Sequence, residues 1–378
     1  MRWSSLPLRR RGVLALGLAS AVAGPVAAQA PRGAARPLVV GQLFDTSLAE
    51  QDVAKDFLVG SRAAWQDVNS RGGLRGRPVQ HFALEVDGTA AGTRAALQQL
   101  ADNPACVALC GTVSDPVAVQ VAGLLPQLAP ALAHVAPWLQ NSGLEIDERT
   151  FPIFAGRQEQ IAHALKALSL VGVQEVGAVF ASARELELYQ RDVTRSAAAL
   201  KLKLSTFRAD GDLDALGQRL GANTPALLLF LGGTPELVQF TRGLGRQARQ
   251  RYVIGLGEVN LQTVQQMAPG RSTPVVAAQP VPLAASPLPV VRHYRECLAR
   301  FFDEPPVALS LAGFLAARYA FEVLAAIDVP LTRASALAAF QRRADVDIGG
   351  FRVSFDEARR SAGFVTQSML TIDGRVVG

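Results

Sequence analysis

The sequence is poor in the residues that build metal centres and disulfide frameworks. Among 378 residues there are three cysteines and four histidines, and the histidines follow no spacing typical of zinc ligands. Cys106 and Cys110 flank a strand-like VAL, and ~13 Å would separate them along a strand, too far for a disulfide. Cys297 falls in an amphipathic helix pattern. We therefore expect three buried thiols, no metal site and no cofactor.

The motifs of common enzyme classes are also absent. The sequence has no G-x-S-x-G, P-loop or H-E-x-x-H segment, and neither GLG triplet, at 243–245 or 255–257, continues as a dinucleotide-binding motif. No basic patch is interleaved with aromatic residues, and the net charge of +6 falls to +2 without the four arginines of the first 30 residues. These absences argue against an enzyme and against nucleic acid as a partner.

The first 28 residues have the pattern of a signal peptide. A basic stretch, MRWSSLPLRRR, precedes the apolar run GVLALGLASAVAG, which is too short to span a bilayer. Small residues in PVAAQA favour cleavage after Ala28. The pair Arg10-Arg11 leaves both the general and the twin-arginine export routes open, and a retained membrane anchor is the alternative interpretation. No later stretch reads as long and apolar enough to span a membrane, so we expect a soluble, exported protein.

Beyond residue 37 the chain alternates strand and helix patterns in two series. Runs such as VVGQLF and ALLLFL are apolar throughout, as expected for strands buried on both faces of a parallel sheet. A chain of this length exceeds the usual size of one hydrophobic core. The fold class predicted is therefore α/β, with two doubly wound lobes joined by a hinge of three crossings, near 156–158, 282–285 and 344–348. We expect residues 37–156 and 285–345 in the first lobe, and 157–284 and 346–378 in the second.

Two segments have local sequence signatures, the connection after the first predicted helix and the C-terminal part of the chain. In NSRGGLRGRP, Gly72 and Gly73 predict a left-handed helix end, Gly76 a tight turn and Pro78 the start of an edge strand. Near the C-terminus, two helices over 287–302 and 309–327 precede GGFRVSFDE and FVTQSMLTIDGRVV, which together predict a closing hairpin.

Several segments, taken in order, resemble one family. VNSRGGLRGRPVQ is similar to the connection after the first helix in periplasmic solute-binding proteins of ABC transporters, of the leucine/isoleucine/valine-binding type. CGTVSDPVAV resembles the family's third strand and its ligand-facing turn. FPIFAGRQEQ resembles the first crossing between the lobes, where Arg157 matches a common arginine. GGFRVSF resembles a C-terminal motif. The resemblance covers about residues 37–378. It implies a type I periplasmic binding fold that closes by a hinge on a small-molecule ligand.

The resemblance also implies where the ligand binds. In that family the turn after the third strand and the loop after the fourth grip the polar end of the ligand, while the second lobe contributes further contacts. The matching positions here are Ser114, Asp115, Val135, Ala136, Trp138, Thr234 and Glu258. Ser114 or Asp115 followed by Pro116 is also a helix start, so Asp115 is either a ligand contact or a helix cap.

Three departures from the family pattern bear on the ligand. Asp115 stands where amino-acid binders carry a hydroxyl residue, and a carboxylate there would repel a ligand carboxylate by ~4 kcal/mol. Trp138 replaces a threonine-like position and either stacks on a ligand or packs in the core. Thr234 stands where an aromatic residue often covers an ammonium, although the acidic Glu258 is kept. A small neutral or cationic ligand, with or without a ring, is therefore expected instead of leucine, isoleucine or valine.

The function that this resemblance implies is binding and delivery without chemistry. We expect a periplasmic monomer that captures a small polar or aromatic molecule between its lobes and hands it to ABC permease subunits in the inner membrane. A periplasmic module that presents its ligand to a membrane receptor uses the same fold and is the alternative. Neighbouring genes for a permease and ATPase would favour transport, and a histidine kinase gene would favour sensing.

Overall fold

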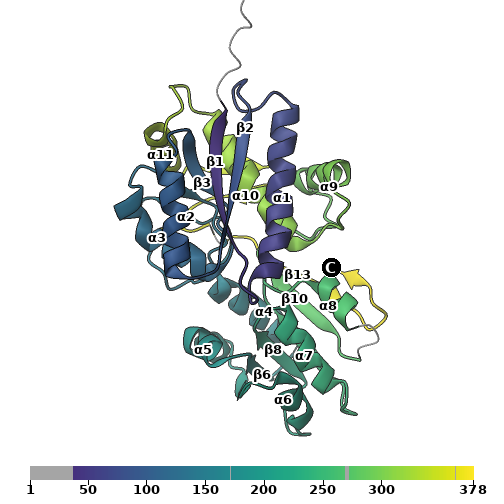
Figure 1. The fold of residues 1–378 in the computed structure, drawn as a ribbon. Coiled ribbons are helices and arrows are strands. Elements are labelled where there is room, and N and C mark those ends of the chain that lie inside the picture. Colours follow the sequence, from purple (N-terminus) through teal and green to yellow (C-terminus); the bar gives the residue numbers. More distant parts are fainter. Residues whose placement is uncertain (1–36, 171, 269–271, 362) are drawn as a thin grey trace, which may run out of the picture. The chain divides into compact units, whose positions relative to one another are not determined.

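The computed structural model describes residues 37–170, 172–268, 272–361 and 363–378. The predicted signal peptide over 1–28 lies outside these residues. In the described part the chain forms two α/β lobes, each built around its own largely parallel sheet (Figure 1). The predicted fold class is therefore confirmed.

The sheet of the first lobe has five parallel strands in the order β2-β1-β3-β4-β5. Their bounds are β1 (Leu38–Asp45), β2 (Val79–Val86), β3 (Cys106–Cys110), β4 (Ala133–Val135) and β5 (Thr150–Phe151). The helices of this lobe are α1 (Gln51–Ser70), α2 (Ala90–Asp102), α3 (Asp115–Leu128), α9 (Pro289–Phe301), α10 (Ala308–Ala325) and α11 (Arg333–Gln341).

Each face of this sheet has its own hydrophobic core. Val40 and Ala108 pack with α1, α9 and α10 on one face, whereas Val39 and Leu109 pack with α2 and α3 on the other. Successive side chains of a strand point to opposite faces, so a strand covered on both sides is largely apolar, and the buried polar residue inside β1 is Gln42. This explains the apolar run in β1.

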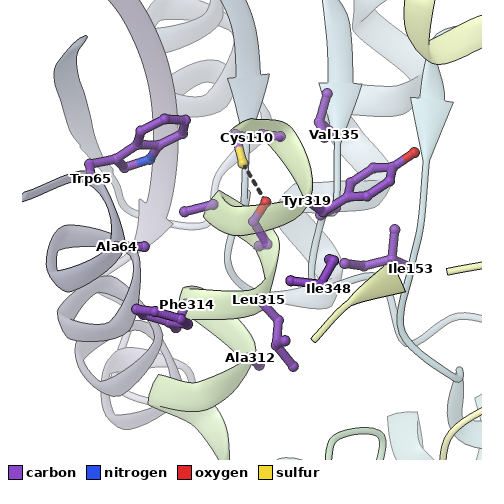
Figure 2. Close-up of a cluster of buried hydrophobic side chains, with 14 of the residues drawn as sticks. Ala64, Trp65, Cys110, Val135, Ile153, Ala312, Phe314, Leu315, Tyr319 and Ile348 are labelled. Atoms are coloured by element: carbon purple, nitrogen blue, oxygen red, sulfur yellow. Dashed lines mark hydrogen bonds between the residues drawn. The ribbon is translucent and has the colours of Figure 1, made fainter. Parts of the chain in front are cut away.

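Figure 2 shows the core on the α1 and α10 face, where Trp65 of α1 and Phe314 of α10 lie beneath the strands. The Cys110 thiol donates a hydrogen bond to the Ala316 carbonyl, with Sγ and O 3.4 Å apart. All three cysteines are free and buried, which confirms the prediction of buried thiols.

α1 and α10 approach each other through two glycines. A Cβ added to Gly60 would lie 1.7 Å from the Ser310 carbonyl oxygen, and one added to Gly313 would lie 1.9 Å from that of Phe57. Only hydrogen fits at these two positions, so the helix backbones touch directly. α10 is also long and apolar enough to cross a membrane, contrary to the sequence prediction, but 67% of it is buried in the core of this lobe.

The sheet of the second lobe has seven strands in the order β14-β13-β10-β9-β8-β6-β7. Its parallel strands are β6 (Glu175–Phe180), β7 (Lys203–Arg208), β8 (Leu227–Leu231), β9 (Tyr252–Gly255) and β10 (Val275–Gln279). Two strands extend the sheet beyond β10 in antiparallel pairing, β13 (Thr366–Leu370) and β14 (Val376–Val377). Its helices are α4 (Arg157–Leu170), α5 (Ala183–Ala199), α6 (Leu213–Arg219), α7 (Thr234–Leu244) and α8 (Leu261–Met267).

The C-terminal segment differs from the prediction of one closing hairpin. β11 (Val346–Ile348) and β12 (Phe351–Val353) form a separate hairpin that turns at Gly349–Gly350, and its apolar side chains pack in the core of the first lobe. Phe364 packs on that same core and Val365 on the core of the second lobe. The chain thus changes lobes after β12 and not near 344–348, because the short hairpin buries its side chains against α10.

The glycines after α1 take the conformations that the sequence predicts. Gly72 and Gly73 have φ of 98° and 75°, and the Gly73 N–H donates to the Val68 carbonyl, which satisfies the end of the helix. Gly76 also has a positive φ, 76°. A Cβ at Gly73 would meet the Arg77 carbonyl oxygen at 2.0 Å, so this turn requires glycine.

Candidate functional site

The candidate site is a cavity of about 290 Å³ lined by residues of both lobes. The first lobe contributes the start of α1 and of α3, and the second contributes the turns after β6, β8 and β9. These are carboxyl ends of parallel strands, where open α/β sheets bind their ligands. The polar residues that line the cavity are Glu50, Asp52, Asp115, Arg157, Ser182, Arg184, Glu185, Tyr189, Thr234, Glu236 and Glu258.

Two larger hollows lie elsewhere in the described chain. One, of about 470 Å³, is mainly apolar and includes Leu283 and Val307, and the other, of about 620 Å³, lies among residues of α10, α11 and β11. Size alone therefore does not identify the ligand site. The smaller cavity is the stronger candidate because charged side chains of both lobes converge on it at the ends of the strands.

Arg157 lies at the centre of this cavity, in the first turn of α4. Its Nη1 is 2.8 Å from a carboxylate oxygen of Glu185 and its Nη2 is 2.5 Å from one of Glu258. The guanidinium also stacks over the Tyr189 ring, 4.1 Å from the ring centre. Burial alone would lower the pKa of Arg157, but Glu258 and Glu185 raise it well above its usual value. Arg157 is therefore a permanent cation held by two carboxylates.

The cavity holds more carboxylates than Arg157 can neutralise. Glu50 and Asp115 of the first lobe face the same space as Glu185 and Glu258. Burial, together with the charges of Glu258 and Asp45, raises the pKa of Glu50 to about 8. Burial also raises the pKa of Asp115 and of Glu185, although Arg157 opposes both shifts. Ionisation of these carboxyl groups inside the cavity is therefore costly.

The sequence left it open whether Asp115 caps α3 or contacts the ligand, and the structure gives the cap to Ser114. Ser114 caps α3, because its Oγ accepts from the Val117 N–H at 3.3 Å and donates to Asp45 at 2.9 Å. Asp115 is the first residue of α3 and does not cap it. Its Oδ1 accepts from the backbone N–H groups of Gln140 and Asn141 at 2.7 and 2.8 Å, so it fixes the loop after β4 while lining the cavity.

Trp138 packs in the core of the first lobe and is 1% exposed. Its ring packs against those of Phe57 and Phe154, with ring centres 5.9 and 5.4 Å away. Val135 and Ala136 are fully buried as well. These three residues and Ser114 lie behind the residues that line the cavity, which favours core packing over ligand stacking for Trp138.

Thr234 and Glu258 lie together on the second lobe's side of the cavity. The Thr234 hydroxyl donates to the Glu258 carbonyl at 3.2 Å and accepts from the Asn260 N–H at 3.0 Å. Thr234 thereby fixes the turn that carries Glu258. Asn260 also donates to the Asp56 carboxylate of α1 at 2.5 Å, a direct contact between the lobes.

Sequence reasoning missed Glu50, Glu185 and Tyr189. Ser182 and Glu185 have the spacing of a helix start after β6, and Ser182 does accept from the Glu185 N–H at 3.2 Å. The Glu185 side chain turns to Arg157 instead of completing the cap. The signal that could have found it is its position just after the carboxyl end of a buried strand.

The family described as Periplasmic binding protein matches residues 37–371. The chain therefore belongs to the periplasmic binding proteins, a family of solute-binding proteins. No curated protein matches the sequence.

Solved structures with the same fold are distant in sequence. An extracellular ligand-binding receptor from Verminephrobacter eiseniae is 18% identical, with a TM-score of 0.80 over 90% of this chain and 100% of that one. A possible leucine/isoleucine/valine-binding protein from Rhodopirellula baltica is 20% identical, with a TM-score of 0.78 over 93% and 98%. A branched-chain amino acid ABC transporter protein from Thermus thermophilus, with bound valine, is 15% identical, with a TM-score of 0.77 over 90% and 94%.

Proposed function

We propose that this protein is the exported solute-binding component of an ABC importer and that its cleft takes a small cationic solute. The observation that supports this most is the excess of carboxylates around one cavity: Arg157 is already paired with two, and Glu50 and Asp115 face the same space. At 4 Å and an effective dielectric constant of 20, each ionised carboxylate attracts a ligand cation by ~4 kcal/mol before desolvation. Burial raises the pKa of Glu50 and Asp115, and a bound cation would favour their ionised forms. An amine or a guanidinium compound fits this chemistry.

Valine, which is bound in the Thermus thermophilus relative, fits this cleft poorly. An α-amino acid brings a carboxylate as well as an ammonium, and Asp115, on the first lobe's side of the cavity, would repel a carboxylate placed beside it. Each pair of like charges costs as much as an opposite pair gains at the same distance. We therefore expect leucine, isoleucine and valine to bind weakly.

Thermal unfolding of the purified protein with a panel of ligands tests this proposal. Mono- and diamines and guanidinium compounds are compared with amides, aromatic compounds and the three branched amino acids. A ligand at 100 times its Kd stabilises the fold by about 2.7 kcal/mol, a rise of a few degrees in Tm. A shift with valine and none with any cation would overturn the proposal.

A matched set of variants tests whether the Asp115 charge contributes to binding. Asp115→Asn keeps an oxygen for the N–H groups of Gln140 and Asn141 and removes only the charge, so we expect at least tenfold weaker binding of the cation with an unchanged Tm. Asp115→Ala should also lower the Tm, because two buried N–H groups lose their acceptor. Glu187→Gln, on the exposed side of α5, is the control. Unchanged affinity in Asp115→Asn would leave Asp115 with a structural role only.

Delivery to a permease is tested in cells. Deletion of the gene should abolish uptake of the labelled cation that binds best, and the intact gene should restore it. Ligand-dependent signalling through a histidine kinase, with uptake unchanged, would favour the sensory alternative.

A further inference from the structure

A second group of reactive side chains lies at the opposite end of α1 from the cleft. Asp67 is in the last turn of α1, while His293 and Cys297 are one turn apart on α9. One ligand atom from each residue lies within 4.8 Å of the other two. From Glu50 to Asp67 the helix rises ~25 Å, so this group is separate from the cleft.

The His293 imidazole nitrogen Nε2 lies at the centre of the group. It is 2.9 Å from Asp67 Oδ2 and 3.6 Å from Cys297 Sγ. In a tetrahedral zinc site, bonds of 2.0–2.3 Å place neighbouring N, O and S ligand atoms ~3.3–3.6 Å apart. The sulfur is already at that distance from the nitrogen, the carboxylate oxygen is a few tenths of an ångström too close to the nitrogen, and the oxygen and sulfur lie within 4.8 Å of each other.

The surroundings hold the three ligand atoms in place. The side chain of Asp67 is 2% exposed and that of His293 23%, and Cys297 is buried. Arg71 donates from Nε to Asp67 Oδ1 at 3.1 Å, which leaves Oδ2 for His293. Such a second partner orients a metal-binding carboxylate. The edge of the Phe314 ring fixes the imidazole, with ring centres 5.7 Å apart.

The three side chains meet at one nitrogen atom. Asp67 Oδ2 and Cys297 Sγ both contact His293 Nε2, while Arg71 pairs with the other carboxylate oxygen of Asp67. A metal ion would bind the Cys297 thiolate, with the thiol proton released, and would replace the direct contact between His293 and Asp67.

We propose that Asp67, His293 and Cys297 form a binding site for one divalent transition-metal ion of the zinc type. Imidazole nitrogen, thiolate sulfur and carboxylate oxygen are the ligands that Zn²⁺ takes, and solvent at the 23%-exposed His293 side would supply the fourth ligand. Binding releases the thiol proton to solvent and joins the end of α1 to α9. The sequence predicted no metal site because Asp67 lies 226 residues from His293.

Titration with Co²⁺ of the full-length mature protein, free of any histidine tag, tests the site. We expect one ion per chain and a thiolate-to-cobalt charge-transfer band that Zn²⁺ displaces. Cys297→Ala should abolish the band, and His293→Ala and Asp67→Asn should weaken binding at least tenfold. His163→Ala, at an exposed histidine on α4, should leave both unchanged.

A second measurement uses only the wild-type protein, so it does not depend on whether the variants fold. In the wild-type protein, Zn²⁺ should slow the reaction of Cys297 with a thiol reagent at least tenfold, as followed by mass spectrometry of the labelled peptide, while a cationic cleft ligand should not. Three results would overturn the proposal. The wild type could show no charge-transfer band, or His163→Ala could weaken Co²⁺ binding as much as His293→Ala does. Zn²⁺ could also leave the rate of Cys297 labelling unchanged.

Discussion

At the scale of single residues, the charges of the cleft are coupled across several elements. Glu50 precedes α1, Asp115 begins α3 and Arg157 begins α4. Asp115 and Arg157 each influence the pKa of the other, and both influence the pKa of Glu50. Residues that are far apart in sequence thus share one electrostatic environment. Burial makes ionisation of the Glu50 and Asp115 carboxyl groups costly, and a bound cation would offset that cost.

Glu50 provides a pH-dependent prediction at this scale. Its pKa rises from 4.5 to about 8 on folding, so the stability that its protonated form contributes is complete below pH 4.5 and is lost as the pH rises through about 8. We expect the Tm of the ligand-free protein to fall between about pH 4.5 and about pH 8, and Glu50→Gln to reduce that fall.

Glu357→Gln, at an exposed position, is the control for the pH dependence. Differential scanning calorimetry across the pH range provides the measurement. If Glu50→Gln and Glu357→Gln follow the same pH profile as the wild type, then Glu50 is not a buried acid in solution.

At the scale of elements, the contact between α1 and α10 depends on glycine. Gly60 and Gly313 let the two helix backbones meet, and they do so in the core that also contains Trp65 and Phe314 (Figure 2). Helix propensity alone would favour alanine at both positions. Tertiary packing overrides that preference here.

Substitution of helical glycines by alanine should consequently have opposite effects at two sites. Gly313→Ala places a methyl group 1.9 Å from the Phe57 carbonyl oxygen and should destabilise the protein by at least ~1–3 kcal/mol. Gly123→Ala, in α3, meets nothing within 4 Å and should stabilise it by ~0.5–1 kcal/mol. Chemical denaturation gives both values, and equal effects of the two variants would contradict the packing argument.

At the scale of the whole molecule, the two lobes share three chain crossings and a cavity. One direct contact between them, between Asp56 and Asn260, lies outside that cavity. Burial raises the pKa of Asp56 to about 6, while the hydrogen bond from Asn260 opposes the shift. The contact is thus a polar one that a hinge motion can break and re-form.

Ligand binding should bring the lobes together around the hinge. We expect small-angle scattering to show a smaller radius of gyration in the presence of a saturating cation, because the ligand is sequestered between lobes that are free to move without it. The control is the same measurement with valine, which should leave the radius unchanged. Identical scattering curves with and without a tightly bound ligand would contradict a hinge mechanism.

Local sequence patterns were sufficient for the fold and for its turns. The alternation of buried strands with helices predicted two α/β lobes, and the pair Gly72-Gly73 predicted the left-handed end of α1, because both features depend on residues only a few positions apart. The order of segments also indicated the family, which the match over 37–371 shows. The resemblance to that family implied that Asp115 and Glu258 lie near the ligand, and their contact with it stays a prediction.

The tertiary structure alone decided which of these side chains meet. The burial of Trp138, the pairing of Arg157 with Glu185 and Glu258, and the packing of the 346–353 hairpin on the first lobe all depend on the order of strands and on which helices cover them. The same holds for Asp67, His293 and Cys297, which α1 and α9 bring together. Such contacts join residues separated by tens to hundreds of positions, and no local pattern encodes them because their energy arises only when the elements pack.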